Sequence, residues 1–170
     1  MMQRRLFLTL AAAAGSANAA PYVVDGAARV RAGALRGTLL DLTLAGTRLI
    51  AVGERGHVLL SDDEGKTWRQ ARSVPTRTTL TCVHATEPNT LWAAGHGGMI
   101  LRSTDAGETW SIVTGNADGP DVLLCIRVEA DGRGLAMGGF GIALATADGG
   151  KTWKPLSLLQ GDAGERHLNR

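Results

Sequence analysis

The sequence is poor in the residues that metal, redox and membrane functions need. It has two cysteines and four histidines, and none of them shows H-x-x-H or C-x-x-C spacing, so a zinc site is not supported. No phosphate-binding loop or nucleophile–base pair is present. Beyond the N-terminus, no apolar run approaches the ~18 residues of a membrane-spanning helix. The sequence therefore predicts no cofactor, no metal and no membrane span in the mature protein.

An excess of charge of one sign is also absent. The chain holds 18 Lys and Arg residues against 16 Asp and Glu residues. Arg4 and Arg5 belong to an apparent export signal, so the remainder of the chain is neutral. A neutral surface lacks the positive field that nonspecific nucleic-acid binding needs, and no nucleic-acid partner is expected.

The N-terminus has the three parts of a cleavable export signal. Arg4 and Arg5 form a basic start, residues 6–14 are apolar, and small residues end in Ala17-Asn18-Ala19. We expect cleavage after Ala19 and a periplasmic or extracellular mature protein. Because the arginine pair resembles the twin-arginine motif, both that route and the general secretory route stay open.

Glycine, by contrast, is abundant: 23 of 170 residues, about twice average usage, predict many tight turns rather than a helical bundle. The turns recur in register. Three octapeptides share a hydroxyl residue, an aspartate, a glycine and a final Thr-Trp pair; they span residues 61–68, 103–110 and 146–153. Their first residues are 42 and 43 positions apart, as are Gly53, Gly95 and Gly138. The chain therefore contains three repeats.

Each repeat reads as four short strands. In the first, apolar runs at 39–44, 48–52 and 57–61 are separated by glycine turns, and a fourth run opens at Trp68. A tandem unit of four strands and ~40–50 residues is typical of a propeller blade. We predict an all-β β-propeller with three complete blades in an incomplete ring. The predicted divisions are a signal peptide at 1–19, an N-terminal segment at 20–36, blades at 37–77, 78–120 and 121–166, and the start of a fourth blade at 167–170.

The octapeptide has a local physical reason. The Asp63 carboxylate, supported by the Ser61 hydroxyl, can accept hydrogen bonds from the turn that follows. Gly65 supplies the positive φ of the reversal, and Trp68 can cover the turn. The same roles are expected in all three repeats. The predicted turn residues, called box residues below, are Ser61, Asp63, Gly65, Trp68, Ser103, Asp105, Gly107, Trp110, Thr146, Asp148, Gly150 and Trp153.

These octapeptides match the Asp-box of sialidase-like, or BNR-repeat, propellers. The run 51–63 and the later segments 94–103 and 167–169 resemble the photosystem II stability/assembly factor-like family, over nearly all of the chain after Leu39. The resemblance implies a noncatalytic assembly factor that acts through protein contacts. Because such propellers close a ring of about seven blades, three blades indicate an N-terminal half. Truncation is the preferred explanation, and completion of the ring by further chains and an open arc are the alternatives.

The box aspartates could be taken for the carboxylate pair of a glycoside hydrolase. Because they occupy the same position in successive blades, they should lie far apart, and we interpret them as turn formers. A sialidase also needs a tyrosine nucleophile, and the only tyrosine is Tyr22, just after the signal. We therefore predict that the protein is not an enzyme. The alternative is a fragment of a carbohydrate-active propeller, either a glycoside hydrolase or a sialidase-like protein.

Four side chains are candidates for a binding rim. The turns between the second and third strands of each blade, and the connections between blades, should emerge opposite the boxes. Arg55, His96 and Phe140 stand among glycines in those turns, and Arg77 lies in a basic connection. Because exposed aromatic and arginine side chains are enriched at interface hot spots, these four residues are candidates for binding a protein partner; the alternative is that they are ordinary turn residues with no binding role.

Both cysteines fall at equivalent positions of the first strands of their blades. The side chains of Cys82 and Cys125 should therefore point to the same side of successive blades, and no disulfide is expected. The sequence predicts two small buried inner-strand residues. His84 is likewise expected as an inner-strand residue.

An incomplete ring should leave apolar surface uncovered at its two ends. On the third blade this surface should include part of the set Leu123, Ile126, Met137, Ile142 and Leu144. Large exposed apolar faces promote association. We therefore expect self-association through the open blade faces.

Overall fold

A computed structural model describes residues 26–31, 33–116 and 121–157 of the chain. These residues form three antiparallel four-stranded sheets, each with its strands in chain order. Blade 1 holds β1 (Leu39–Ala45), β2 (Arg48–Gly53), β3 (Val58–Ser61) and β4 (Arg69–Gln70). Blade 2 holds β5 (Leu80–Ala85), β6 (Leu91–Gly95), β7 (Ile100–Ser103) and β8 (Ser111–Thr114). Blade 3 holds β9 (Leu123–Val128), β10 (Gly134–Gly138), β11 (Ala143–Thr146) and β12 (Lys154–Pro155).

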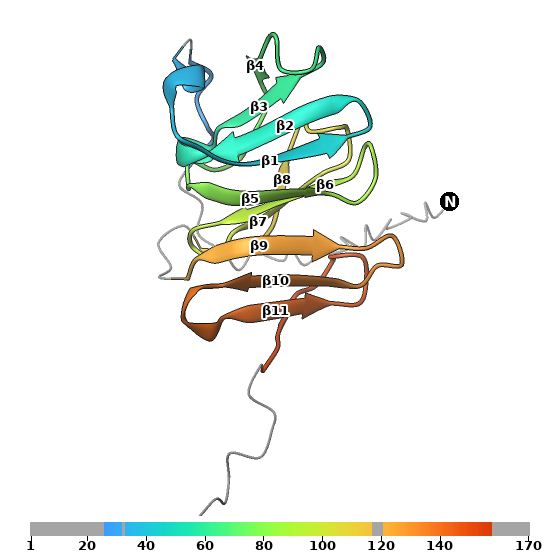
Figure 1. Cartoon of the computed structure of the whole chain (residues 1–170). Coiled ribbons are helices and arrows are strands. Elements are labelled where there is room, and N and C mark those ends of the chain that lie inside the picture. Colours follow the sequence, from blue (N-terminus) through green and yellow to red (C-terminus); the bar gives the residue numbers. More distant parts are fainter. Residues whose placement is uncertain (1–25, 32, 117–120, 158–170) are drawn as a thin grey trace, which may run out of the picture.

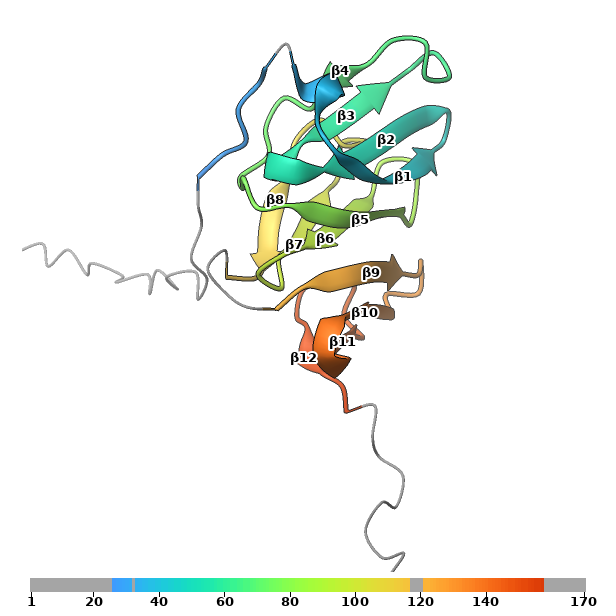
Figure 2. The same cartoon turned by 60° about the vertical axis from the view of Figure 1, so that its left-hand side comes forward.

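The blades follow one another in a row (Figure 1). Their first strands, β1, β5 and β9, lie side by side and form a common inner edge, which the turned view also shows (Figure 2). The three short 3₁₀ turns are η1 (Ala34–Arg36), η2 (Glu54–Gly56) and η3 (Gly139–Gly141). This arrangement confirms the predicted all-β propeller of four-stranded blades, as an open ring.

Two apolar joints hold the blades together. We call the side of a blade that looks toward the next blade its forward face, and the opposite side its backward face. In the first joint, Ile50, Val52, Val58 and Leu60 of blade 1 pack with Val83, Leu91, Ala93 and Leu101 of blade 2. In the second, Trp92, Ala94 and Ile100 of blade 2 pack with Ile126, Val128 and Ala136 of blade 3. Successive side chains of a strand point to opposite faces of the sheet, so every blade has one set of side chains on its forward face and another on its backward face.

The backward face of blade 1 is covered in part by the N-terminal segment. Ala34 of η1 packs on Ala51 and Leu59 in a small cluster with Trp68. On the inner edge the face remains open, since Leu42 and Leu44 are exposed. The N-terminal segment therefore caps the outer half of this face only.

The predicted apolar surface of blade 3 was largely wrong. Leu123 and Ile126 are buried, because they point backward into the joint with blade 2, and Ile142 and Leu144 pack against the same joint. Of the predicted set only Met137 is exposed. The open forward face instead carries Leu124, Leu135 and Met137.

Several sequence predictions fall beyond the residues that the structure describes. They include the export signal, its cleavage site and the segment 158–170. Within the described ranges, no helix has the length and apolar character needed to cross a membrane.

Candidate functional site

The first box turn is held by one carboxylate and one hydroxyl. Asp63 Oδ1 accepts a hydrogen bond from Thr67 N at 2.8 Å, and Oδ2 accepts one from the Thr67 hydroxyl at 2.6 Å. Ser61 Oγ donates to Asp63 at 2.9 Å and accepts from Gly65 N at 2.8 Å. Gly65 has a φ of 87°, which favours glycine. The octapeptide thus forms a self-contained turn between β3 and β4.

The same hydrogen bonds recur in the other two repeats. Thr109 N and Oγ1 donate to Asp105 at 2.9 and 2.6 Å, and Thr152 N and Oγ1 donate to Asp148 at 3.0 and 2.6 Å. Ser103 and Thr146 hydroxyls each accept from the box glycine, at 3.0 Å in both turns. The turns of all three repeats therefore share one geometry.

The tryptophans differ among the three turns. Trp68 and Trp110 each donate from Nε1 to the carbonyl of their box glycine at 2.9 Å. Trp153 Nε1 is buried without a partner among the described residues. The Trp92 ring packs against this turn and lies edge-on to Trp153, with ring centroids 6.2 Å apart. A Cβ on Gly150 would lie 2.1 Å from the Trp92 ring. The third turn therefore departs from the expected tryptophan cap.

The box carboxylates are suited to holding turns rather than to acid catalysis. Hydrogen bonds from Thr67 lower the pKa of Asp63, and hydrogen bonds from Thr152 lower that of Asp148. Burial raises the pKa of Asp105, but hydrogen bonds from Thr109 and Ser103 outweigh it, so that pKa is also lowered. Each carboxylate is engaged within its own turn. Among the described residues, no group of three or more His, Cys, Asp or Glu side chains could hold a metal ion.

An arginine hollow of about 180 Å³ opens on blade 1. We define it by its lining residues, Arg29, Arg31, Arg55, His57 and Arg77. Three stretches of chain meet there: the N-terminal segment, the η2 turn between β2 and β3, and the connection from blade 1 to blade 2. Four arginines from positions far apart in the sequence therefore line one hollow.

Two hydrogen bonds and a close backbone approach hold these stretches together. Ala28 N donates to the Val74 carbonyl at 2.8 Å, and Arg77 Nε donates to the Ala27 carbonyl at 3.3 Å. Gly56, with a φ of 69°, lies so close to the connection that a Cβ would sit 2.0 Å from Thr76 O. The neighbouring Arg55 is itself left-handed, with a φ of 58°, and its side chain is exposed. The turn therefore fixes Arg55 at the mouth of the hollow.

His57 is the one buried side chain of the hollow, at 5% exposure. Burial lowers its pKa, Glu54 opposes this effect, and the charges of Arg55 and Arg31 lower the pKa further. The imidazole is therefore neutral at pH 7. Its Nδ1 has no hydrogen-bond partner in the described part of the chain. The positive charge of the hollow comes from its arginines.

The structure brings together two of the four predicted rim residues. Arg55 and Arg77 share the hollow, whereas His96 and Phe140 are exposed on the corresponding turns of blades 2 and 3 and do not line it. Phe140 is fully exposed, with a φ of 56°. The four residues therefore do not form one contiguous site around the hollow.

Arg29, Arg31 and His57 were not predicted as site residues from the sequence. The Arg-x-Arg spacing of residues 29–31 was a usable signal, because alternate residues of an extended segment point to one side. Their proximity to Arg55, however, depends on how the N-terminal segment docks on blade 1. That docking has no repeat signature.

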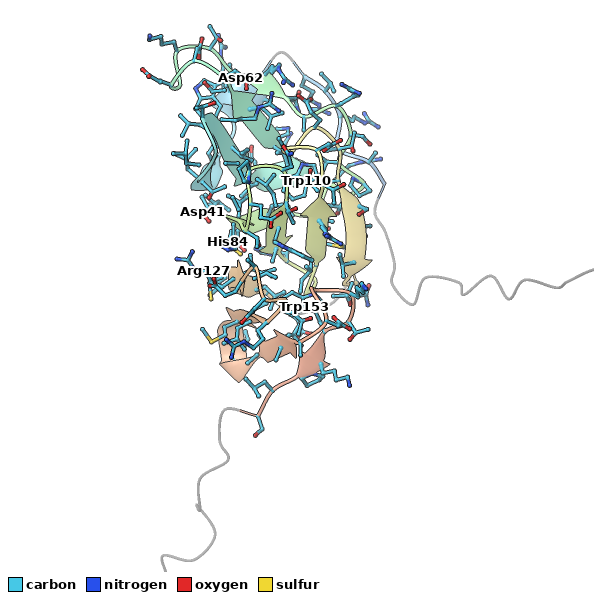
Figure 3. The ribbon with its side chains drawn as sticks, turned by 90° about the vertical axis from the view of Figure 1, so that its right-hand side faces the viewer. Asp41, Asp62, His84, Trp110, Arg127 and Trp153 are labelled. Carbon is cyan, nitrogen blue, oxygen red and sulfur yellow. The ribbon has the colours of Figure 1, made fainter. Side chains whose placement is uncertain are left out.

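The inner edge carries a groove of about 440 Å³ across β1, β5 and β9. Asp41, His84 and Arg127 lie one after another along it (Figure 3). The neighbouring thiols are both free: Cys82 is buried, as predicted, but Cys125 is exposed. Burial raises the pKa of Cys82 to about 12. The prediction of a buried Cys125 was wrong because no blade covers the forward face of blade 3 in the described structure.

Comparisons with known proteins identify the same architecture. No protein-family profile and no curated protein matches the chain. Among solved structures, YCF48 bound to a D1 peptide is 24% identical over 70% of this chain, with a TM-score of 0.60. YCF48 from Cyanidioschyzon merolae is 25% identical over 77% of the chain, with a TM-score of 0.59.

An enzyme with the same fold lies further away in sequence. An ancestral GH74 enzyme is 15% identical over 77% of this chain, which spans 18% of the enzyme, with a TM-score of 0.58. The chain spans about 40% of the length of each YCF48 chain. These likenesses support a β-propeller fold.

Proposed function

We propose that this chain is a noncatalytic, protein-binding propeller module, similar to a photosystem II assembly factor. The arginine hollow binds an acidic segment of its partner. The observation that carries the proposal is the convergence of four arginines and a neutral histidine on one concavity of about 180 Å³. We further propose that the Asp-boxes are structural, that the chain corresponds to the N-terminal part of a larger propeller, and that it works outside the cytoplasm after export.

The chemistry of the hollow selects for carboxylates. Guanidinium groups present paired N–H donors that match the two oxygens of a carboxylate. The positive charges of the four arginines that line the hollow favour a bound anion. The small volume admits one or two side chains rather than a folded surface. A flexible peptide segment rich in Asp or Glu is therefore the partner that fits.

The YCF48 structures support this proposal at the level of fold. One of them holds a D1 peptide, so a propeller with this architecture binds a peptide. The carbohydrate-active alternative rests on the GH74 neighbour, whose 15% identity carries the fold alone. No specific observation in the described residues favours it.

Binding can be measured by fluorescence anisotropy with a labelled peptide of alternating Glu and Ser. We expect binding that weakens with added salt, because exposed charges are screened. The matched peptide with Gln in place of Glu should bind at least about tenfold more weakly, equivalent to ~1.4 kcal/mol. Equal binding of the two peptides would contradict the proposal.

The site is tested by paired variants. Arg55→Ala and Arg77→Ala should each weaken binding of the Glu peptide several-fold. Arg36→Ala is the matched control, because Arg36 is exposed near the same N-terminal segment but does not line the hollow. An equal loss in all three variants would show that binding follows net charge and not the hollow.

A further inference from the structure

The forward face of blade 3 has the composition of a buried joint. By repeat position, Leu135 and Met137 correspond to Trp92 and Ala94 of blade 2 and to Ile50 and Val52 of blade 1. Those four counterparts are at most 1% exposed inside the two joints, whereas Leu135 and Met137 are 43% and 41% exposed. A hollow of about 490 Å³ lies over this face, lined in part by Leu135, Ala145 and Leu156.

The backward face of blade 1 has the complementary composition. Leu42 and Leu44 occupy the positions of Val83 and Ala85, which pack into the first joint. In blade 1 the two leucines are 53% and 60% exposed. Among the described residues, both halves of a joint that occurs twice within the chain are thus exposed.

The η1 cap on blade 1 does not cover strand β1, which is the part of the backward face that a further joint would use. In both internal joints, the first strand of the following blade lies against the first two strands of the preceding blade: β5 against β1 and β2, and β9 against β5 and β6. The η1 turn covers Ala51 and Leu59, on β2 and β3. Strand β1, with Leu42 and Leu44, remains accessible for the same contact.

We propose that the forward face of blade 3 binds β1 of a second copy of this chain, head to tail. The joint would repeat the internal ones, with Leu135 and Met137 of one copy packed on Leu42 and Leu44 of the next. A head-to-tail contact closes a ring where the rotation permits and otherwise extends a chain of copies. The inference is independent of the arginine hollow.

Polar contacts in the internal joints predict those of the new one. Asp41 accepts from Val83 N at 2.8 Å, and His84 Nε2 lies 3.2 Å from the Val128 carbonyl. Cys125 occupies the position of Asp41, and Arg127 that of His84. Cys125 of one copy should therefore lie beside Leu42 of the next, where Arg127 can donate to the Leu44 carbonyl.

Multi-angle light scattering of the full chain tests the association. We expect a dimer or larger species that dissociates on dilution from tens of micromolar. Leu135→Glu should give a folded monomer, as judged by circular dichroism. Phe140→Glu is the matched control, because it places the same charge on an exposed apolar residue of the same blade, away from this face; it should leave the association unchanged. A wild-type monomer would overturn the proposal.

A cross-link tests the geometry. Leu42→Cys should form an intermolecular disulfide with the native Cys125 under mild oxidation, giving linked species on non-reducing gels. The linkage should be absent from the double variant Leu42→Cys/Cys125→Ser. It should also be absent from the double variant Leu42→Cys/Leu135→Glu. Association without this linkage, or linkage that survives Leu135→Glu, would show that the copies meet through another surface.

Discussion

Each box aspartate satisfies a backbone amide and a hydroxyl of its turn with its two carboxylate oxygens. In the second turn, Asp105 accepts from Thr109 N and Oγ1, and Ser103 Oγ donates to it at 2.8 Å. These bonds keep the outgoing strand β8 in place next to β7. The residue therefore contributes to stability through local hydrogen bonds rather than through a shared site.

Replacing Asp105 with Ala should lower the free energy of unfolding by about 1–3 kcal/mol, because the donors of the turn lose a charged acceptor. Peptide binding at the arginine hollow should persist while the variant is folded. Urea denaturation measures the change. Glu87→Ala is the control, since Glu87 is exposed in the turn between β5 and β6 and its loss should barely move the midpoint. Unchanged stability with lost binding in Asp105→Ala would refute the turn-former role.

Acid should destabilise the protein through these carboxylates. The pKa values of Asp63, Asp105 and Asp148 are lowered in the folded state, so the folded form favours their charged state. The stabilisation is complete above the unfolded pKa of about 4 and is lost as the pH falls through the lower folded values. Urea midpoints should therefore fall between about pH 4 and pH 2. Asp105→Ala should show a smaller fall, and an identical fall would contradict this assignment.

A network of ion pairs connects the first two box turns. Arg48 of β2 pairs with Asp62 at 2.5 Å and with Glu108 at 3.0 Å, and Arg69 of β4 pairs with Glu108 at 2.5 Å. Arg48 and Glu108 side chains are only 20% and 19% exposed, so water screens them less than surface pairs. The group supplements the apolar joint between blades 1 and 2.

Glu108→Gln should weaken this joint, because both arginines lose a charged partner. We expect a loss of about 1 kcal/mol, between the values typical of exposed and buried pairs. Thermal unfolding at low and high salt measures it, and the difference from wild type should shrink in high salt. Glu87→Gln, on an exposed position of the neighbouring turn, should have no such effect. A salt-independent difference would point to packing rather than charge.

The positions of the strands could be predicted from the sequence. Which side chains of each blade's first strand point to the forward or the backward face could not. The repeat spacing and glycine turns located the strands of the first blade to within one or two residues. Each first strand, however, contains a register shift, between Leu39 and Asp41 in β1 and at the equivalent places in β5 and β9. This extra residue breaks the alternation, so that Leu123 and Ile126 share the backward face. The predicted exposed set of blade 3 failed for that reason.

At the scale of the whole molecule, the candidate site depends on contacts that the repeat does not encode. Arg55 and Arg77 were predicted because they stand in loops at a recurring position. Arg29 and Arg31 reach them only because the N-terminal segment runs along blade 1, where Gln70 Nε2 donates to the Arg29 carbonyl at 3.2 Å. The segment also supplies η1, which caps part of blade 1. One stretch outside the repeats thus contributes to both the stability and the site.

The central claim is that the arginine hollow, not the box turns or the inner groove, binds the partner. Hydrogen–deuterium exchange of the full chain with and without the Glu-containing peptide tests it most directly. We predict slower exchange in residues 26–31, 54–57 and 76–78, and no change in residues 61–68, 103–110 and 146–153. Protection confined to the box turns, or to the first strands along the inner groove, would contradict it.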